Sequence, residues 1–298
     1  MTPQLQQKAE SYRQRLEQQL QQRLNGESRP PAPTLSAAMQ YATLNGGKRI
    51  RGLLVYLTGE LFQTPLPQLD PVAAAIEMVH AYSLIHDDLP AMDDDDIRRG
   101  RPACHIQFGE AVAILAGDAL QTLAFSQLSG DQALQRQPDR ALQLIATLAH
   151  ASGEYGMVGG QMLDMEAEQR RVSLSQLQQI HHHKTGALIH AAIAMAATLS
   201  AATAQQRQRL ADYSRAIGLA FQVRDDILDA TADSDTLGKP VGSDAAAQKS
   251  TYPALLGLDA AYSELKALQQ QAHQALQGFD HHAAPLRDLA DYIAQRPY

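Results

Sequence analysis

The chain has 298 residues, of which 45 % are hydrophobic, so a folded globular protein is expected rather than a disordered one. Its formal net charge of −7 argues against a general nucleic-acid-binding protein. The one cysteine, Cys104, excludes an internal disulfide and fits a structural role in a reducing compartment.

Helical patterns begin at the N-terminus. Residues 3–24 form an amphipathic pattern rich in Gln and charge, without the apolar centre of a signal peptide. A Pro-rich connection covers 26–36. Ser36 is expected to cap a second helix that stops at Gly46-Gly47.

Asp70-Pro71 opens the next predicted helix, since proline is tolerated in the first turn of a helix. This helix runs to about Leu89, because Pro90 disfavours helical geometry in the residue before it. The remaining patterns predict helices over 107–129, 137–153, 155–171, 174–202 and 205–230, a loop over 231–253 and a terminal helix pair over 258–295.

The longest apolar stretch, 187–202, is too short and too Ala-rich for a membrane span, so we expect a cytoplasmic protein with no integral membrane segment. No strand alternation and no repeat of 20–50 residues is evident. The sequence therefore predicts an all-α fold, in which residues 1–298 form a single domain built as a bundle of about ten helices.

Two clusters of aspartates carry the strongest chemical signal. The first is DDxxxxD at 87–93, and the second is DDxxD at 225–229, inside an otherwise apolar helix. Carboxylates that face one cavity raise one another's pKa, and a hard cation removes that conflict. Mg²⁺ fits, because it takes few carboxylates and completes its shell with water and phosphate oxygens. The candidate ligands are Asp87, Asp88, Asp93, Asp225, Asp226 and Asp229.

Helical spacing extends both clusters. Gln222 lies on one polar stripe with the second cluster, and His80 lies two turns before Asp87 on the same helical face. An EF-hand does not fit, because its spaced ligands and closing Glu are absent. The run at 93–96 taken alone is as well explained by a solvated acidic loop.

Basic residues accompany the acidic clusters. They are Lys48, Arg49 and Arg51 in NGGKRIRG, Arg98, Arg99 and Arg101 after the first cluster, Lys184 in HHHKTGALI, and Lys239 and Lys249 after the second cluster. Each alone is more often a solvated surface residue. Arg is suited to forked recognition of phosphate oxygens, so their placement indicates two diphosphate substrates, one chelated through metal and one held by cations. The run His181-His182-His183 makes a poor zinc site, because three consecutive helical residues point in three directions.

Five segments resemble, in order, the motifs of the trans-isoprenyl diphosphate synthases: GGKRIRG, HDDLPAMDDDDIRRGRP, GGQMLDMEAE, KTGALI and FQVRDDILD. The resemblance covers about residues 40–250. It is closest to the bacterial short-chain farnesyl type, which has two extra residues in the first Asp motif, here Pro90-Ala91. It implies an isoprenoid synthase fold with a deep central cavity, a homodimer, and three Mg²⁺ ions per site, for which Mn²⁺ can substitute.

The resemblance also implies roles for single residues. It assigns Mg²⁺ binding to Asp87, Asp88, Asp93 and Asp225, supported by Asp226 and Asp229. It assigns binding of the allylic diphosphate to Arg98, Lys184 and Lys239, and binding of isopentenyl diphosphate to Lys48, Arg51, His80 and Arg99. Thr185 and Gln222 would place dipoles near the reacting carbons. One departure is Gly52, which stands where the family usually has Pro.

The implied reaction is ionisation, condensation and elimination. It joins isopentenyl diphosphate to dimethylallyl and geranyl diphosphate and yields farnesyl diphosphate, the dimethylallyltranstransferase and geranyltranstransferase steps of isoprenoid biosynthesis. Ser83 shares the helical face of Asp87, whereas Tyr82 lies off that stripe. The resemblance nevertheless selects Tyr82 as the floor of the cavity, because an aromatic residue at that position is the short-chain signature, and a C15 product is expected.

Three alternatives stay open at this point. A geranylgeranyl diphosphate synthase is the nearest. A terpene cyclase would usually carry a different second motif and would not need the site formed by Lys48, Arg51 and His80. A non-catalytic metal-binding helical protein would leave the ordered basic motifs unexplained.

Overall fold

The computed structural model describes residues 1–25, 31–168, 170–231 and 249–296. Lys239 lies outside the described residues. The long helices are α1 (Pro3–Leu24), α2 (Pro33–Thr43), α3 (Ile50–Leu61), α4 (Leu66–Asp87), α6 (Glu110–Gly130), α8 (Pro138–Ser152), α9 (Met157–Ala167), α11 (Ala187–Leu199), α12 (Ala204–Thr231), α16 (Leu258–Ala275) and α17 (Ala284–Gln295). Shorter helices are α5 (Cys104–Phe108), α7 (Gln132–Gln135), α10 (Leu174–His181) and α15 (Tyr252–Leu256), with a π-helical turn η1 (His182–Gly186) and a 3₁₀ turn η2 (His281–Ala283). The all-α prediction is confirmed.

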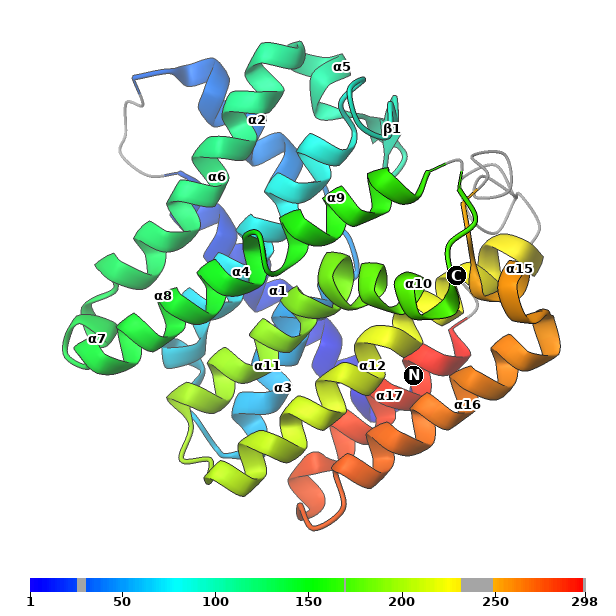
Figure 1. Cartoon of the computed structure of the whole chain (residues 1–298). Coiled ribbons are helices and arrows are strands. Elements are labelled where there is room, and N and C mark those ends of the chain that lie inside the picture. The colour runs from blue at the N-terminus through cyan, green and yellow to red at the C-terminus, as the bar shows by residue number, and fades with distance from the viewer. Residues whose placement is uncertain (26–30, 169, 232–248, 297–298) are drawn as a thin grey trace.

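Helix α4 lies at the centre of the bundle. It packs against α3, α6 and α11, while α12 lies on the far side of α11 and carries α16 and α17 (Figure 1). Every residue of α4 from Leu69 to Val79 is buried, so this part of the helix is enclosed on all sides. One hydrophobic core runs from Leu5 in α1 to Ala294 in α17.

Two helix starts differ from the prediction. Helix α2 begins at Pro33 and not at Ser36, since proline in the first turn is already set for helical geometry. Helix α4 begins at Leu66, and Asp70 lies inside it. The Asp70 carboxylate does not cap this helix, because it accepts two hydrogen bonds from Arg15, both at 2.7 Å, and one from the Tyr56 hydroxyl at 2.9 Å.

A small hairpin was not predicted. Strands β1 (Ile97–Arg98) and β2 (Arg101–Pro102) pair antiparallel, with Arg98 opposite Arg101. Both residues of the connecting turn, Arg99 and Gly100, have positive φ, as a two-residue turn of type I′ requires. Each strand is two residues long, which is too short for a pattern of alternation.

Candidate active site

The first acidic cluster forms where α4 ends. Asp87 is the last helical residue, and the loop that follows folds back so that the Asp93 N–H donates to the Asp87 carbonyl at 2.9 Å. Burial raises the pKa of Asp87 to about 6; Lys184 opposes this rise, and the charge of Asp93 adds to it. Negative charge is thus concentrated at Asp87, where water solvates it poorly, beside the exposed Asp93.

Asp88 has a different environment from Asp87. It is buried, and its carboxylate accepts from Arg98 Nε at 2.8 Å and also contacts Arg98 Nη2. Arg98 reaches Asp95 as well, at 3.1 Å. The structure therefore gives this predicted metal ligand an arginine partner, and the two carboxylates fix Arg98 beside the cluster.

Two lysines connect the first cluster to helix α9. Lys184 Nζ donates to Asp164 at 2.6 Å, and Lys249 Nζ lies 3.8 Å from Asp164 and 3.9 Å from Asp93. Burial acts to raise the pKa of Asp164, but Lys184 and Lys249 hold it below its usual value. Asp164 was not assigned from the sequence, although it lies within the GGQMLDMEAE segment.

Lys184 and Thr185 occupy the π-helical turn η1. The sequence predicted one helix over 174–202, but the structure widens it at this turn. Helix α9 approaches so closely that a methyl group at Gly160 would overlap the backbone nitrogen of Lys184. Such turns are common at functional sites, and this one directs Lys184 and Thr185 towards the cavities described below.

Two aspartates of the second cluster, Asp225 and Asp226, lie in different environments. Asp225 contacts Arg296 at 2.5 Å, and burial raises its pKa against the opposing effect of Arg296. Asp226 accepts the N–H of Tyr252 at 2.9 Å and lies 3.7 Å from His181. Consecutive helical residues point about 100° apart. Asp226 therefore lines the polar chamber with Gln222, and Asp225 lines the basic chamber.

Four predicted ligands of isopentenyl diphosphate come together in a cavity of about 350 Å³, here called the basic chamber. Lys48, Arg51, His80 and Arg99 line it, together with Phe221, Asp225 and Arg296. Burial lowers the pKa of Arg51 to about 10. Burial and four arginines hold the pKa of His80 well below its ordinary value, so that it stays neutral. Crowded, poorly solvated cations favour an anionic ligand.

An apolar chamber of about 490 Å³ adjoins the basic chamber and shares Arg51, His80 and Phe221 with it. Tyr82, 6 % exposed, and Ser83 both line it, so the structure places Tyr82 in the cavity although helical spacing alone did not. The Tyr82 ring meets His86 edge-on at 5.4 Å. Other walls are formed by Met92, Met157, Val158, Gln161, Met162 and Met165.

A polar chamber of about 150 Å³ lies on the other side. It shares Lys184 and Gln222 with the apolar chamber and is lined by Asp164, Asp226 and Lys249 as well. The three chambers are thus contiguous, with the apolar one between two charged ones. Thr185 and Gln222 line the apolar chamber.

The donor set fits a hard divalent cation. Within the described residues, neither acidic cluster brings three ligand atoms within 4.8 Å of one another; the one group that does is Asp280-His281-His282, on the surface. One or two carboxylates per ion, completed by water and phosphate oxygens, is the arrangement that Mg²⁺ prefers. Asp87 and Asp93 on one side and Asp225 on the other offer carboxylate oxygens of this kind.

Comparison with known proteins agrees with this geometry. A farnesyl diphosphate synthase of Escherichia coli is 55 % identical over 264 residues, covering 87 % of this chain and 88 % of that protein. A chloroplastic geranylgeranyl pyrophosphate synthase 9 of Arabidopsis thaliana is 43 % identical, covering 88 % and 74 %. A crystal structure of an FPP/GFPP synthase from Zymomonas mobilis superposes with a TM-score of 0.88 at 39 % identity, covering 99 % and 100 %. The family model described as polyprenyl synthetase matches residues 32–284, and the chain therefore belongs to the polyprenyl synthetase family.

Proposed function

We propose that this protein is a farnesyl diphosphate synthase, which condenses isopentenyl diphosphate with dimethylallyl and then geranyl diphosphate. The observation that carries the proposal is the order of the three chambers. The apolar chamber joins the basic chamber on one side and the polar chamber on the other. Two diphosphates with one growing hydrocarbon chain between them fit this order.

The allylic diphosphate binds on the acidic side. Asp87, which lines the apolar chamber, Asp93, and Asp225, which lines the basic chamber, would hold Mg²⁺ between them, three ions per site as the resemblance implies and with Mn²⁺ as a substitute. Bound metal neutralises charge on the leaving group. Arg98 and Lys184 bind the diphosphate oxygens directly. The hydrogen bond to Asp164 orients Lys184 for contact with the diphosphate. Lys239, which lies outside the described residues, is proposed as a further contact from the sequence alone.

The cation that forms on ionisation lies in the apolar chamber, which keeps water away from it. Thr185 and Gln222 present dipoles to it. Lys48, Arg51, Arg99 and neutral His80 hold isopentenyl diphosphate so that its double bond attacks C1 of the cation. The departed diphosphate takes the proton. Among the described residues that line the apolar chamber, Asp87 is the one carboxylate that could act as a base, and it belongs to the metal site.

Tyr82 sets the product length at C15 in this proposal, because its buried ring occupies the chamber next to the first acidic cluster. A geranylgeranyl diphosphate synthase is the alternative that the comparisons favour most, since such a relative is 43 % identical. A terpene cyclase and a non-catalytic metal-binding protein are disfavoured, because neither needs the basic chamber.

We also propose that the chain is one domain, acts as a homodimer and works in the cytoplasm. Helix α6 is long and apolar enough to cross a membrane, but that is weak support for a membrane location. Its exposed side carries Ile114 and Leu115, and Leu142 of the neighbouring helix α8 is 65 % exposed. A second copy of the chain would cover such large apolar side chains.

The test incubates the protein with Mg²⁺, labelled isopentenyl diphosphate and dimethylallyl diphosphate, and then chromatographs the dephosphorylated products. Farnesol is the expected main product. Geranylgeraniol would select the longer-chain alternative, a cyclic hydrocarbon would select the cyclase, and no incorporation of label would overturn the proposal.

A further inference from the structure

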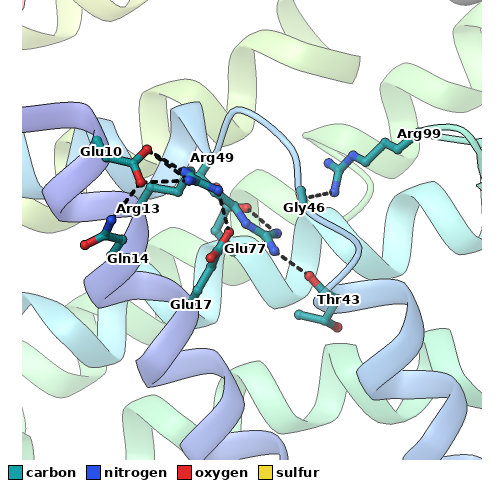
Figure 2. Close-up of polar contacts among 9 residues, drawn as sticks. All are labelled: Glu10, Arg13, Gln14, Glu17, Thr43, Gly46, Arg49, Glu77 and Arg99. Carbon is teal, nitrogen blue, oxygen red and sulfur yellow. Dashed lines mark hydrogen bonds and ion pairs between the residues drawn. The ribbon is translucent and has the colours of Figure 1, made fainter. Parts of the chain in front are cut away.

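A buried ion pair lies at the wall of the basic chamber, where Arg49 is one of the lining residues. Arg49 and Glu77 are 5 % and 1 % exposed, and Arg49 Nη1 lies 3.4 Å from Glu77 Oε2. Arg49 Nη2 also donates to the carbonyl of Thr43 at 2.6 Å (Figure 2). The other Glu77 oxygen, Oε1, accepts the backbone N–H of Gly52 at 3.0 Å.

These contacts join three helices at the point where the basic chamber is assembled. Thr43 ends α2, Gly52 is in the first turn of α3, and Glu77 is in the middle of α4. Lys48 and Arg51 flank the Arg49–Glu77 contact along the chain, and His80 follows Glu77 by one helical turn. The pair therefore fixes how far Lys48 and Arg51 stand from His80.

The backbone at Arg49 is unusual for a residue other than glycine. Its φ is 51°, in the left-handed region, which costs about 1 kcal/mol or more and persists only where the surroundings enforce it. The bonds from its guanidinium to Glu77 and Thr43 supply that enforcement. The left-handed turn in turn sets the directions in which Lys48 and Arg51 leave the chain.

Gly52 makes this arrangement specific to the present chain. At the third position of α3 its N–H has no partner within the helix, and Glu77 supplies one. Proline, which stands here in the family pattern, has no N–H to donate. Leu16 of α1 fills the space that a side chain at position 52 would need.

Stability alone does not account for the pair. Taking two charges out of water costs several kcal/mol each, and replacing a buried pair by apolar residues is often neutral or stabilising. Glu77 also opposes the charges of Arg51 and Arg99, two cations of the basic chamber, and Asp88 acts in the same direction on Arg99. Glu77 thereby offsets the repulsion between Arg51 and Arg99 while no anion is bound.

We propose that Glu77, through Arg49 and the Gly52 N–H, is a positioning residue for the diphosphate that binds in the basic chamber. Glu77 does not line the chamber; Arg49 lines it, and its guanidinium is engaged by Glu77 and the Thr43 carbonyl. They hold Lys48, Arg51 and His80 in the arrangement that receives it. The identity of this ligand as isopentenyl diphosphate rests on the proposed function.

The test compares Glu77→Gln with a control on the same helix, Asp70→Asn, which breaks an ion pair with the partly exposed Arg15; neither residue lines the basic chamber. Glu77→Gln is expected to raise the KM for isopentenyl diphosphate about tenfold or more and the KM for geranyl diphosphate less than twofold. The control is expected to lower Tm without changing either KM. An equal rise of both KM values, or no rise, in a folded Glu77→Gln protein would overturn the proposal.

A double variant separates positioning from stability. Arg49→Met with Glu77→Leu is expected to regain most of the lost Tm while the KM for isopentenyl diphosphate stays raised; recovery of that KM would overturn the proposal. Titration of inorganic pyrophosphate in EDTA, followed by calorimetry, tests the chamber without turnover. Weaker binding by Glu77→Gln than by Asp70→Asn supports the proposal, and equal binding overturns it. Absence of turnover in the unaltered protein would count against the proposed function alone.

Discussion

Shortening Tyr82 is the most direct test of what limits the product. The Tyr82 ring is buried at the wall of the apolar chamber and meets His86 edge-on. Tyr82→Ala removes an aromatic ring and should cost at most about 3–5 kcal/mol of stability, by analogy with Phe→Ala in a core. The loss should fall below that range, because the ring borders a cavity and not a closed core.

The space that Tyr82→Ala creates should accept one more five-carbon unit. At about 0.8 kcal/mol per buried CH₂, five carbons add roughly 4 kcal/mol of apolar burial. Since each 1.4 kcal/mol is tenfold in an equilibrium constant, this is on the order of a thousandfold in favour of holding the longer chain. A product shift from C15 towards C20 is therefore expected, without a large change in the KM for isopentenyl diphosphate.

The assay chromatographs the dephosphorylated products made from labelled isopentenyl diphosphate and dimethylallyl diphosphate. Tyr82→Phe is the control, because it keeps the ring and should keep farnesol as the product. Circular dichroism checks that each variant is folded. Farnesol alone from a folded, active Tyr82→Ala enzyme would refute the idea that this ring is the floor.

Three further predictions concern charge and assembly. In EDTA, protonated Asp87 stabilises the folded protein because its pKa is raised; this contribution is present below about pH 4 and is lost as pH rises through about 6. Between pH 5 and 7, Tm should therefore fall less in Asp87→Asn than in the unaltered protein, and equal slopes of Tm against pH would contradict this. Asp164→Asn should lower kcat about tenfold to a hundredfold with the KM for isopentenyl diphosphate unchanged, because Lys184 loses a charged hydrogen bond worth about 1.5–3 kcal/mol; steady-state kinetics with unaltered kcat would argue against it. Leu115→Glu should give a monomer in analytical ultracentrifugation, because it adds charge to the exposed apolar side of α6, and an unchanged sedimentation coefficient would exclude this side as the interface.

The sequence predicted those helices whose ends or faces have local causes. Helix α1 was expected over 3–24 and has those bounds, because its apolar stripe is regular. The start of α4 was wrong, because Asp70 is engaged by Arg15 and Tyr56, which are distant along the chain. Local spacing contains no information on such partners.

The site shows the same division. The residues predicted for the basic chamber lie together because short motifs place Lys48 and Arg51 at the start of α3, His80 on α4 and Arg99 in the hairpin turn. The widened turn at Lys184 depends on the close approach of Gly160, and Arg296 reaches Asp225 from the end of the chain. Neither of these two contacts has a local signal in the sequence. Glu77 has such a signal, since it is the single acidic residue in the apolar run from Val72 to Val79.

Under the proposed function, charge would keep apart two substrates with the same head group. Both carry a diphosphate, so the shape of that group cannot direct one to each chamber. Asp87 and Asp93 would take a diphosphate together with metal, while Lys184, Lys249 and Arg98 offset part of their charge. In the basic chamber, Lys48, Arg51 and Arg99 would attract a diphosphate without metal. Because the apolar chamber adjoins the basic chamber and is lined by Asp87, these charges would set the direction in which the hydrocarbon chain grows.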